Sequence, residues 1–416
     1  MSNVLFLVHR IPYPPDKGDK IRSYHLLKYL CKEHRVFLGT FYDDANDRKH
    51  LGELEEMCVE VCVRPVGGWR SRFGALEALI RSGPLSAGYY RDTHMSQWVS
   101  SVTSREEIHG VVAFSSTMAQ YLPERGSAGP VSIVDLVDVD SDKWRQYAVE
   151  AKPPMSWLYR YEAAALKRYE ADVVAGADFV SVVSEAEREI VPVWVPEQSS
   201  RVRVIPNGVD YEFFRKNAAR PSPFKAGTRV ALFTGAMDYR ANVDGVCWFA
   251  EHVWPPVKEE LPDAEFYIVG SNPAPAVTAL QSVAGITVTG RVPDIRPYLE
   301  HATISVAPLR LARGVQNKVL EALSMELPVI ATPEALRGLS GDLPDSAIAA
   351  RNAGDFKQLI CERLSRPNLR LNESGRRYVK TNYDWEVNLS EFGRMFGANQ
   401  YSQPILAERA GGVAGQ

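Results

Sequence analysis

Short runs of apolar residues alternate with longer amphipathic stretches from the start of the chain. In the first half the expected strands are 4–8, 35–41, 111–114, 131–136 and 177–183, and the expected helices are 21–32, 48–57 and 155–174. Apolar runs of this length, separated by segments with helical periodicity, are typical of buried parallel strands joined by helices. The pattern therefore predicts a doubly wound α/β domain whose last strand is 177–183.

The same pattern starts again after residues 215–227, where Pro221, Pro223 and Gly227 indicate a linker. The expected strands are now 229–234, 266–269, 286–289, 303–307 and 328–331, and the expected helices are 243–260, 276–283, 294–301, 315–325, 355–364 and 371–397. Open α/β sheets bind ligands at the carboxyl ends of their strands. We therefore predict an α/β fold of two doubly wound Rossmann-like domains that face each other across a cleft.

The predicted boundaries place the first domain at 1–215 and the second at 216–384. A helix at 385–399 is expected to return to the first domain, and the Gly- and Ala-rich tail at 400–416 is expected to be disordered. A chain of 416 residues is also too long for a single hydrophobic core, which agrees with two domains.

Composition and charge exclude several classes of function. The formal net charge is only -3, so no strongly basic field indicates nucleic-acid binding. No run of about 18 apolar residues is present, and the apolar start of the chain reads as a strand, not a signal peptide. The five cysteines have spacings that fit neither a disulfide framework nor a zinc site. These features predict a cytoplasmic protein with reduced thiols, whose membrane contact, if it has any, is peripheral.

The most informative segment is 313–332, which reads as a glycine-containing turn, an amphipathic helix and a short apolar strand. Gly314 and Val315 would present free backbone amides at the helix start, where unpaired N–H groups and the helix dipole favour a diphosphate. Lys318 lies one turn further and can reach the same phosphates, and Glu321 is placed to accept hydrogen bonds from ribose hydroxyls. The alternative is a surface helix with an ordinary salt bridge between Lys318 and Glu321.

Together with residues 204–210 (VIPNGVD) and 233–238 (FTGAMD), this segment resembles the retaining GT-B nucleotide-sugar glycosyltransferases of family 4 over essentially the whole chain. Residues 10–22 and 134–144 resemble a narrower branch, the sugar transferases tied to bacterial exopolysaccharide production and the PEP-CTERM/exosortase sorting system. The resemblance implies a nucleotide diphosphate sugar as donor, no cofactor, and a saccharide or lipid-linked acceptor. It also implies that the first domain binds the acceptor and the second binds the donor.

The resemblance assigns residues to the donor site. In the family's E-x7-E pair the second glutamate grips the ribose and matches Glu321, whereas Arg313 stands at the position of the first glutamate. A guanidinium accepts no hydrogen bond, so Arg313 is expected to contact a phosphate or an acidic sugar.

Three further donor residues follow from the resemblance: Arg240, Arg291 and Val292. Gly235 lies in the same loop as Arg240, beside the diphosphate. In that loop Arg240 takes the place of the family's usual lysine beside the leaving diphosphate. Arg291 matches the family's Gly-Arg turn, and its neighbour Val292 is expected near the nucleobase.

Candidate chemistry in the first domain begins at the end of the first strand. Gly18 and Asp19 match the family's glycine loop, which lies under the donor phosphates and beside the acceptor, although a plain turn between strand and helix is the alternative. His9 is a candidate for catalysis or acceptor binding, with a hydrogen-bonded structural histidine as the alternative.

Four aspartates, Asp135, Asp138, Asp140 and Asp142, crowd the end of strand 131–136, where neighbouring carboxylates raise one another's pKa. This crowding makes Asp138 a candidate catalytic residue. Asp138-Val-Asp140 is also a D-x-D sequence, the manganese motif of the unrelated GT-A glycosyltransferases, so a bound divalent cation is the alternative. The second nucleotide-binding half argues against that alternative, and we predict no metal.

Residues 69–81 form a predicted helix with Phe73, Leu76, Leu79 and Ile80 on one side and arginines near the edges. Such a helix suits peripheral contact with an anionic membrane, here the inner face of the cytoplasmic membrane. Core packing, with the arginine stems extended to solvent, is the alternative.

Two other functions remain open. A GT-B nucleotide-sugar epimerase would share the fold but release a free or isomerised sugar, and the departure at Arg313 also suits a non-catalytic scaffold. A nicotinamide oxidoreductase is disfavoured, because no G-x-G-x-x-G follows a predicted strand.

Overall fold

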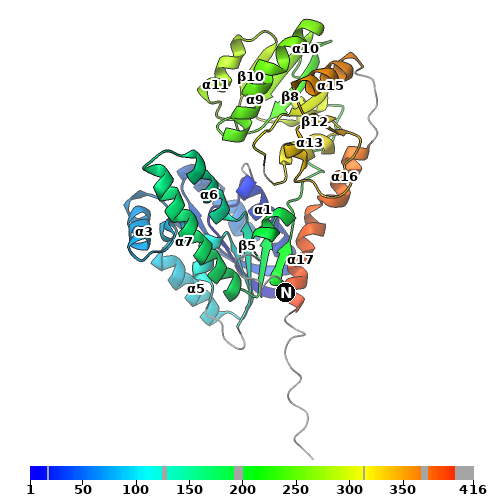
Figure 1. Cartoon of the computed structure of the whole chain (residues 1–416). Coiled ribbons are helices and arrows are strands. Elements are labelled where there is room, and N and C mark those ends of the chain that lie inside the picture. The colour runs from blue at the N-terminus through cyan, green and yellow to red at the C-terminus, as the bar shows by residue number, and fades with distance from the viewer. Residues whose placement is uncertain (16–17, 124–128, 192–199, 313, 367–372, 399–416) are drawn as a thin grey trace, which may run out of the picture. The chain divides into compact units, whose positions relative to one another are not determined.

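The computed structural model describes residues 1–15, 18–123, 129–191, 200–312, 314–366 and 373–398. They form two compact units (Figure 1). The first unit comprises Met1–Ile205 together with the described chain from Glu386, and the second comprises Pro206–Trp385.

The first unit is built around a parallel sheet of seven strands in the order β3-β2-β1-β4-β5-β6-β7. The strands are β1 (Ser2–Val8), β2 (His34–Tyr42), β3 (Glu60–Pro65), β4 (Ile108–Phe114), β5 (Val131–Val137), β6 (Phe179–Val182) and β7 (Val202–Val204). The α-helices are α1 (Gly18–Glu33), α2 (Leu51–Met57), α3 (Gly68–Ile80), α4 (Leu85–Tyr89), α5 (Thr93–Arg105), α6 (Asp140–Glu150), α7 (Met155–Gly176), α8 (Glu185–Ile190) and α17 (Trp385–Ala398).

Strand β1 lies in the middle of this sheet. Its residues 4–8 are at most 1% exposed, as expected for an apolar run covered on both faces of a parallel sheet. At its carboxyl end Val8 pairs with Phe114 of β4. The strand order reverses between β1 and β4, so the loops after these two strands flank the switch point where such sheets bind ligands.

The second unit repeats this design with six parallel strands in the order β10-β9-β8-β11-β12-β13. The strands are β8 (Arg229–Thr234), β9 (Ala264–Val269), β10 (Ile286–Gly290), β11 (Ile304–Ala307), β12 (Val329–Ala331) and β13 (Ala347–Ala349). The α-helices are α9 (Arg240–His252), α10 (Trp254–Glu260), α11 (Pro275–Ala279), α12 (Arg296–His301), α13 (Asn317–Ser324), α14 (Pro333–Leu336), α15 (Ala353–Ser365) and α16 (Ser374–Asn382). Its switch point lies between β8 and β11.

The prediction of two doubly wound α/β domains is confirmed, but the expected set of strands is incomplete. The strands β3, β7 and β13 are missing from it, and all three lie at sheet edges with mostly half-buried residues. The expectation that 177–183 is the last strand of the first unit is wrong, because β7 follows and pairs with β6. Edge strands have a neighbour on one side only and need no continuous apolar run.

Two expected helices are each divided into two. The expected helix 243–260 is α9 and α10, which meet at Val253 immediately before two prolines enter the first turn of α10. Proline has no N–H to donate and is tolerated in a first turn, where no helical partner is needed. The expected helix 371–397 is α16 and α17, separated by Tyr383 and Asp384, and its residues 371–372 lie outside the described chain.

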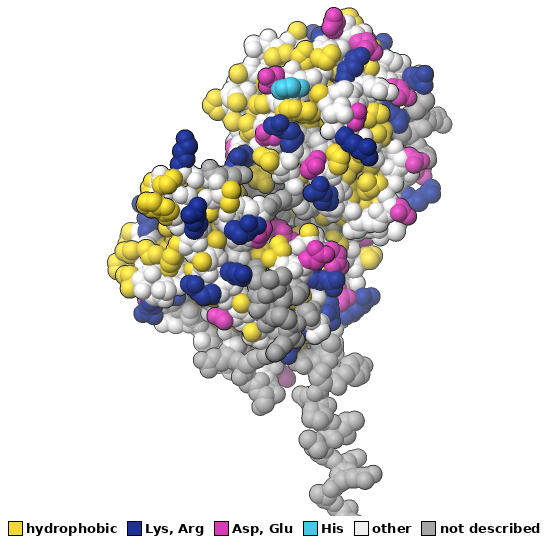
Figure 2. Space-filling model, in the orientation of Figure 1, with side chains coloured by type: hydrophobic (Ala, Val, Ile, Leu, Met, Phe, Trp, Pro, Cys, Tyr) yellow, Lys and Arg dark blue, Asp and Glu magenta, His cyan; other side chains and the backbone are white. Residues whose placement is uncertain are grey.

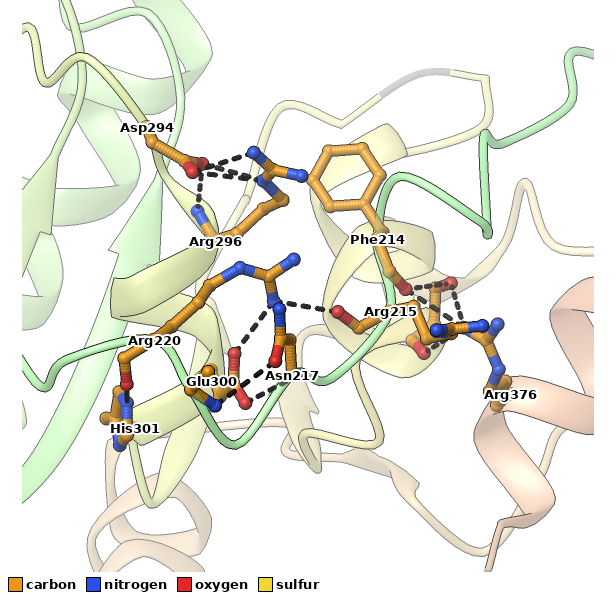
Figure 3. A network of polar contacts seen from close by, with 11 residues as sticks. Phe214, Arg215, Asn217, Arg220, Asp294, Arg296, Glu300, His301 and Arg376 are labelled. Atoms are coloured by element: carbon orange, nitrogen blue, oxygen red, sulfur yellow. Dashed lines mark hydrogen bonds and ion pairs between the residues drawn. The ribbon is translucent and has the colours of Figure 1, made fainter.

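The chain enters the second unit at Pro206, earlier than the expected boundary at 216. Figure 3 shows that the start of the expected linker, 215–227, and the residue before it are held by the second unit. The Arg220 guanidinium donates to the Glu300 carboxylate of α12 at 2.8 Å. Arg376 of α16 donates to the carbonyl oxygen of Phe214 at 3.0 Å. This stretch is therefore held by two helices of the second unit.

Helix α17 belongs to the first unit. The ring of Phe396 fills the space beside Gly110 of β4, where an added Cβ would lie 2.2 Å from the ring. Glu391 pairs with Arg203 at 3.6 Å. The predicted disordered tail, 400–416, lies outside the described residues.

Candidate functional site

A compact polar site lies at the switch point of the second unit. Gly235 follows β8 with φ at +150°, a conformation that favours glycine. A Cβ at this position would lie 2.8 Å from Asn242 Nδ2 and 3.1 Å from Lys318 Nζ. The turn after β8 thus packs directly against two polar side chains, one from α9 and one from α13.

Lys318 and Asn242 form the centre of this site. The Lys318 ammonium donates to Asn242 Oδ1 at 2.5 Å and lies 4.2 Å from the centroid of the Phe233 ring in β8. Asn242 in turn donates to the carbonyl oxygen of Ala236 at 2.8 Å. One amide side chain therefore joins the turn after β8 to the lysine of α13.

Lys318 and Glu321 lie one helical turn apart and are both half-buried. Burial lowers the pKa of Lys318 to about 7, against the opposing effect of Glu321. Burial likewise raises the pKa of Glu321 to about 7, against the opposing effect of Lys318. Within the described chain the Glu321 carboxylate accepts no hydrogen bond and is in no ion pair. The site thus presents one cation and one free acceptor, both poorly solvated.

The loop before α13 differs in part from the expectation. The helix begins at Asn317, two residues later than the expected start at Val315. Gly314 has φ at +56°, and its carbonyl oxygen would lie only 2.1 Å from a Cβ placed on Gly338. Val315 is half-buried against the core. Contact between the two backbones therefore fixes this loop, while Arg313 lies outside the described residues.

The other predicted donor residues lie at two places in the second unit. Arg240 is the first residue of α9 and is exposed. Arg291 is exposed after β10, and Val292 packs half-buried against the core. Strand β10 is an outer strand of the sheet, and β9 separates it from β8. Arg291 and Val292 therefore do not adjoin Gly235 where the strands end.

A second polar site lies at the switch point of the first unit. His9 follows β1, and its Nε2 is 3.5 Å from Asp19 Oδ2. Its ring stacks on Phe114 at the end of β4, with ring centroids 5.9 Å apart. Burial opposes ionisation of Asp19, but its hydrogen bond and ion pair with His9, together with Arg10, hold the pKa of that carboxyl well below its usual value. His9 Nδ1 is buried and has no hydrogen-bond partner among the described residues.

Gly18 and Asp138 have less constrained surroundings. Gly18 begins α1, is exposed, and has open space where a Cβ would be, so no packing within the described chain requires glycine there. Asp138 is exposed after β5. Burial raises the pKa of Asp140, with Asp138 adding to the rise while Lys143 and His9 oppose it. Asp138, Asp140 and His9 therefore share one electrostatic environment.

The aspartate cluster expected from the sequence divides into two kinds of residue. Asp135 is fully buried and accepts two hydrogen bonds from Arg22, at 2.7 and 3.1 Å, and one from Ser181 at 3.0 Å. Asp142 pairs with Arg145 at 2.7 Å. These two aspartates serve structure, and only Asp138 and Asp140 remain at the switch-point edge.

The sequence did not reveal Asn242, Glu170 or the strained turns of the first unit. Burial raises the pKa of Glu170 to about 8, and its Oε2 is buried without a hydrogen-bond partner in the described chain. Ser115 and Val137, after β4 and at the end of β5, have φ at +77° and +66°. Positive φ at residues other than glycine is costly and gathers at functional sites. In the sequence, the one signal for these turns was the position of Ser115 directly after an apolar run.

Among the described residues, no group of three or more His, Cys, Asp and Glu side chains could hold a metal ion. The Asp138-Val-Asp140 sequence thus gains no third acidic or histidine ligand in the described chain. Metal-independent activity stays a prediction.

Comparisons with known proteins bear on the second unit and on the fold. Residues 228–366 match the protein family described as Glycosyl transferases group 1. The chain is 22% identical over 232 residues to glycosyltransferase 1 domain-containing protein 1 of Xenopus tropicalis, a match that spans 52% of this chain and 66% of that relative. The candidate site at Gly235, Lys318 and Glu321 lies inside both the second unit and the family match.

Solved structures show the fold. Sucrose-phosphate synthase of Thermosynechococcus elongatus is 16% identical with a TM-score of 0.66 and covers 97% of this chain and 100% of its own. HepE of Anabaena, in complex with UDP and glucose, is 14% identical with a TM-score of 0.64, covering 96% and 100%. A glycosyltransferase of Rickettsia africae is 13% identical with a TM-score of 0.65, covering 97% and 99%. The solved structures show the two-domain GT-B fold. The family match adds that the second unit carries a domain of the glycosyltransferase type.

Proposed function

We propose that this chain transfers a sugar from a nucleoside diphosphate sugar to a saccharide or lipid-linked acceptor, and that the second unit binds the donor. The observation that carries this proposal is the pair Lys318 and Glu321 at the switch point. A half-buried ammonium suits a diphosphate, and a carboxylate that accepts no hydrogen bond from the described residues suits a pair of ribose hydroxyls. The Anabaena relative holds UDP and glucose, which supports uridine diphosphate as the first nucleotide to test.

The donor chemistry rests on charge that develops on the leaving diphosphate. Lys318, held in place by Asn242, stabilises that negative charge. The backbone at Gly235, Gly314 and Val315 contributes to the same stabilisation. Preorganised cations and amides in a poorly solvated site stabilise the transition state more than the bound substrate. No metal or cofactor is required by this scheme. Arg240 begins the neighbouring helix and adds positive charge at the same edge.

The acceptor is assigned to the switch-point edge of the first unit. His9 lies beside Asp19, and its other ring nitrogen has no hydrogen-bond partner among the described residues, which suits a hydrogen bond to a sugar hydroxyl. Asp138 and Asp140 add two carboxyl groups at the same edge, and burial raises the pKa of Asp140. We assign the transfer to the retaining class without a protein nucleophile, in cytoplasmic synthesis of exopolysaccharide or another cell-surface glycan.

A peripheral membrane contact is part of this proposal. Within the described chain, no helix is both long and apolar enough to cross a bilayer. Helix α3 leaves Trp69, Phe73 and Ile80 between 65% and 77% exposed, so the core-packing alternative does not account for its apolar side. Exposed apolar patches of this kind mark interaction surfaces.

The test is titration calorimetry of uridine diphosphate and other nucleoside diphosphates into the wild type, Lys318→Ala and Glu321→Gln, with thermal melts alongside. Each variant should lose about tenfold to a hundredfold in affinity and keep its fold, because a charge-assisted hydrogen bond contributes about 1.5–3 kcal/mol. Lys357→Ala and Glu260→Gln, which break an exposed ion pair of the same unit, are the matched controls. Near-native affinity in both site variants would refute the donor site. Product analysis with donor alone distinguishes transfer from epimerisation.

A further inference from the structure

The first unit holds a cavity that the proposed sugar transfer does not use. It is an open hollow between α6 and α7 with a volume of about 370 Å³, and Ile190 of α8 also lines it. Ala148, Val149, Ala163 and Ala164 are among the apolar residues that line it. This size is within the range of ligand-binding pockets, about 300–1,000 Å³, and small apolar walls favour an apolar occupant.

Two cations border the cavity on the same face of α7. Arg160 and Lys167 are seven residues apart, with Ala163 and Ala164 between them, so all four project from one side of the helix. Both cations are exposed. Neither has a hydrogen bond or an ion pair with any residue in the described part of the chain. Ser141 also lines the cavity, and its buried Oγ is without a hydrogen-bond partner there.

The acidic side chains on the same face do not compensate these cations. Asp142 is paired with Arg145 at 2.7 Å, and Asp140 lies 3.8 Å from Lys143. Glu77 of α3 is paired with Arg81 at 2.9 Å. Among the described residues, Arg160 and Lys167 therefore have no acidic partner at the cavity.

Exposed apolar side chains surround this charge. Of the seventeen large hydrophobic side chains that are exposed in the described chain, ten lie on α3, α6 and α7. Among them Val149 is 78% exposed and Trp157 is 65% exposed. Tyr161 of α7 donates to the carbonyl oxygen of Gly83 at 3.0 Å, which ties α7 to the end of α3. Figure 2 shows hydrophobic side chains interspersed with Lys and Arg on this part of the first unit.

We propose that the cavity between α6 and α7 binds the apolar chain of an anionic membrane lipid, with Arg160 and Lys167 contacting its phosphate. The exposed side chains of α3, α6 and α7 would then lie in the headgroup region, where aromatic and basic residues are favoured. The inference deepens the peripheral contact proposed above and identifies the partner chemistry. A neutral lipid without a phosphate of net negative charge would leave both cations unpaired.

The first arm of the test measures binding to vesicles by co-sedimentation. Wild-type protein should bind vesicles of equimolar phosphatidylcholine and phosphatidylglycerol and bind pure phosphatidylcholine vesicles far less. The double variant Arg160→Ala/Lys167→Ala should weaken binding to the anionic vesicles by about fivefold for each cation removed. Lys225→Ala/Arg351→Ala, which removes two exposed cations from the second unit, is the matched control and should bind as the wild type does.

The second arm tests the cavity itself with dodecyl phosphate below its micelle concentration, beside inorganic phosphate. Ala163→Leu/Ala164→Leu fills the cavity with good helix formers and should abolish dodecyl phosphate binding, while inorganic phosphate binds neither protein measurably. Equal binding to neutral and anionic vesicles, or unchanged dodecyl phosphate binding in the filled variant, would overturn the inference. Calorimetry with uridine diphosphate on the same variants keeps the two proposals distinct, because donor affinity should be unchanged in all of them.

Discussion

The ammonium group of Lys318 lies 2.5 Å from the side-chain oxygen of Asn242, and the two residues come from the helices that follow the two strands of the switch point. Asn242 is only 6% exposed and also holds the carbonyl oxygen of Ala236 at 2.8 Å. Its position indicates that it acts on a bound donor through the lysine and the turn, as a positioning residue.

Asn242→Ala should therefore weaken nucleoside diphosphate binding by about tenfold, since the lysine loses the acceptor that orients it. Asn242→Asp should instead raise the pKa of Lys318, because a carboxylate stabilises the ammonium. Calorimetry at several pH values measures both effects. Asn272→Ala, which removes an exposed amide near Asp238 in the same unit, is the control. Unchanged affinity in Asn242→Ala would show that the lysine needs no partner to bind the donor.

Gly270→Ala should destabilise the second unit and its donor site together. A Cβ there would lie 1.6 Å from the carbonyl oxygen of Gly235, so the turn after β8 would have to move. Overpacking of this kind costs about 1–3 kcal/mol or more, measurable by urea denaturation. Gly176→Ala, at a glycine with open space around its missing Cβ, should have little effect. A Gly270→Ala protein with native stability and donor affinity would contradict the packing described here.

Activity should survive EDTA, because side chains and backbone amides are proposed to neutralise the diphosphate. The measurement is sugar transfer by the wild type with and without chelator, followed by added manganese. Complete loss of turnover that manganese restores would favour the Asp138-Val-Asp140 alternative. Asp138→Asn then provides the check, since it should weaken manganese activation only if that alternative holds.

Part of the candidate site could be predicted because its signal is local. Lys318 and Glu321 lie on one helix at a spacing that sequence alone reveals. Asn242 could not be found in this way, since its role depends on β8 and β11 being neighbours in the sheet, 76 residues from Lys318 along the chain. Non-local contacts of this kind leave no periodic pattern in either segment.

The aspartates show the same limit of sequence analysis, because a residue that stood out in the sequence has a structural partner far away along the chain. Asp135 stood out as one of four crowded carboxylates, but its partner Arg22 is 113 residues away on α1. The apolar runs, by contrast, located every central strand of both sheets, because burial on two faces demands continuous apolar sequence. The edge strands β3, β7 and β13 lack that demand and were missed, whereas the edge strand β10 was predicted.

The pair Arg22 and Asp135 should be a major element of stability in the first unit. Both side chains are fully buried, and Arg22 also donates to the carbonyl oxygen of Ile205 at 2.9 Å. Asp135→Ala should cost about 3–5 kcal/mol in urea denaturation, because it leaves a buried guanidinium without its counter-charge. Arg22→Met/Asp135→Leu should recover part of that loss. If Asp135→Ala melts as the wild type does, the pair contributes little to folding.

Donor binding should depend on pH with a maximum near pH 7. Binding requires the charged form of Lys318 and the ionised form of Glu321. Burial lowers the pKa of Lys318 to about 7, so its proton is lost from the free protein as the pH rises above 7. Burial raises the pKa of Glu321 to about 7, so its carboxylate becomes protonated as the pH falls below 7. Affinity should therefore fall on both sides, by up to about tenfold for each pH unit.

Variants at the two residues separate the two sides of this profile. Lys318→Met should remove the alkaline decline at the cost of affinity, and Glu321→Gln should remove the part of the acid decline that does not arise from the nucleotide's own phosphate. Because bound diphosphate favours the ammonium form, binding to the wild type at pH 8 should take up a proton. Calorimetry in two buffers of different ionisation enthalpy measures this uptake. A wild type that binds without proton uptake at pH 8, or a Lys318→Met protein that still takes one up, would show that the diphosphate does not contact this lysine.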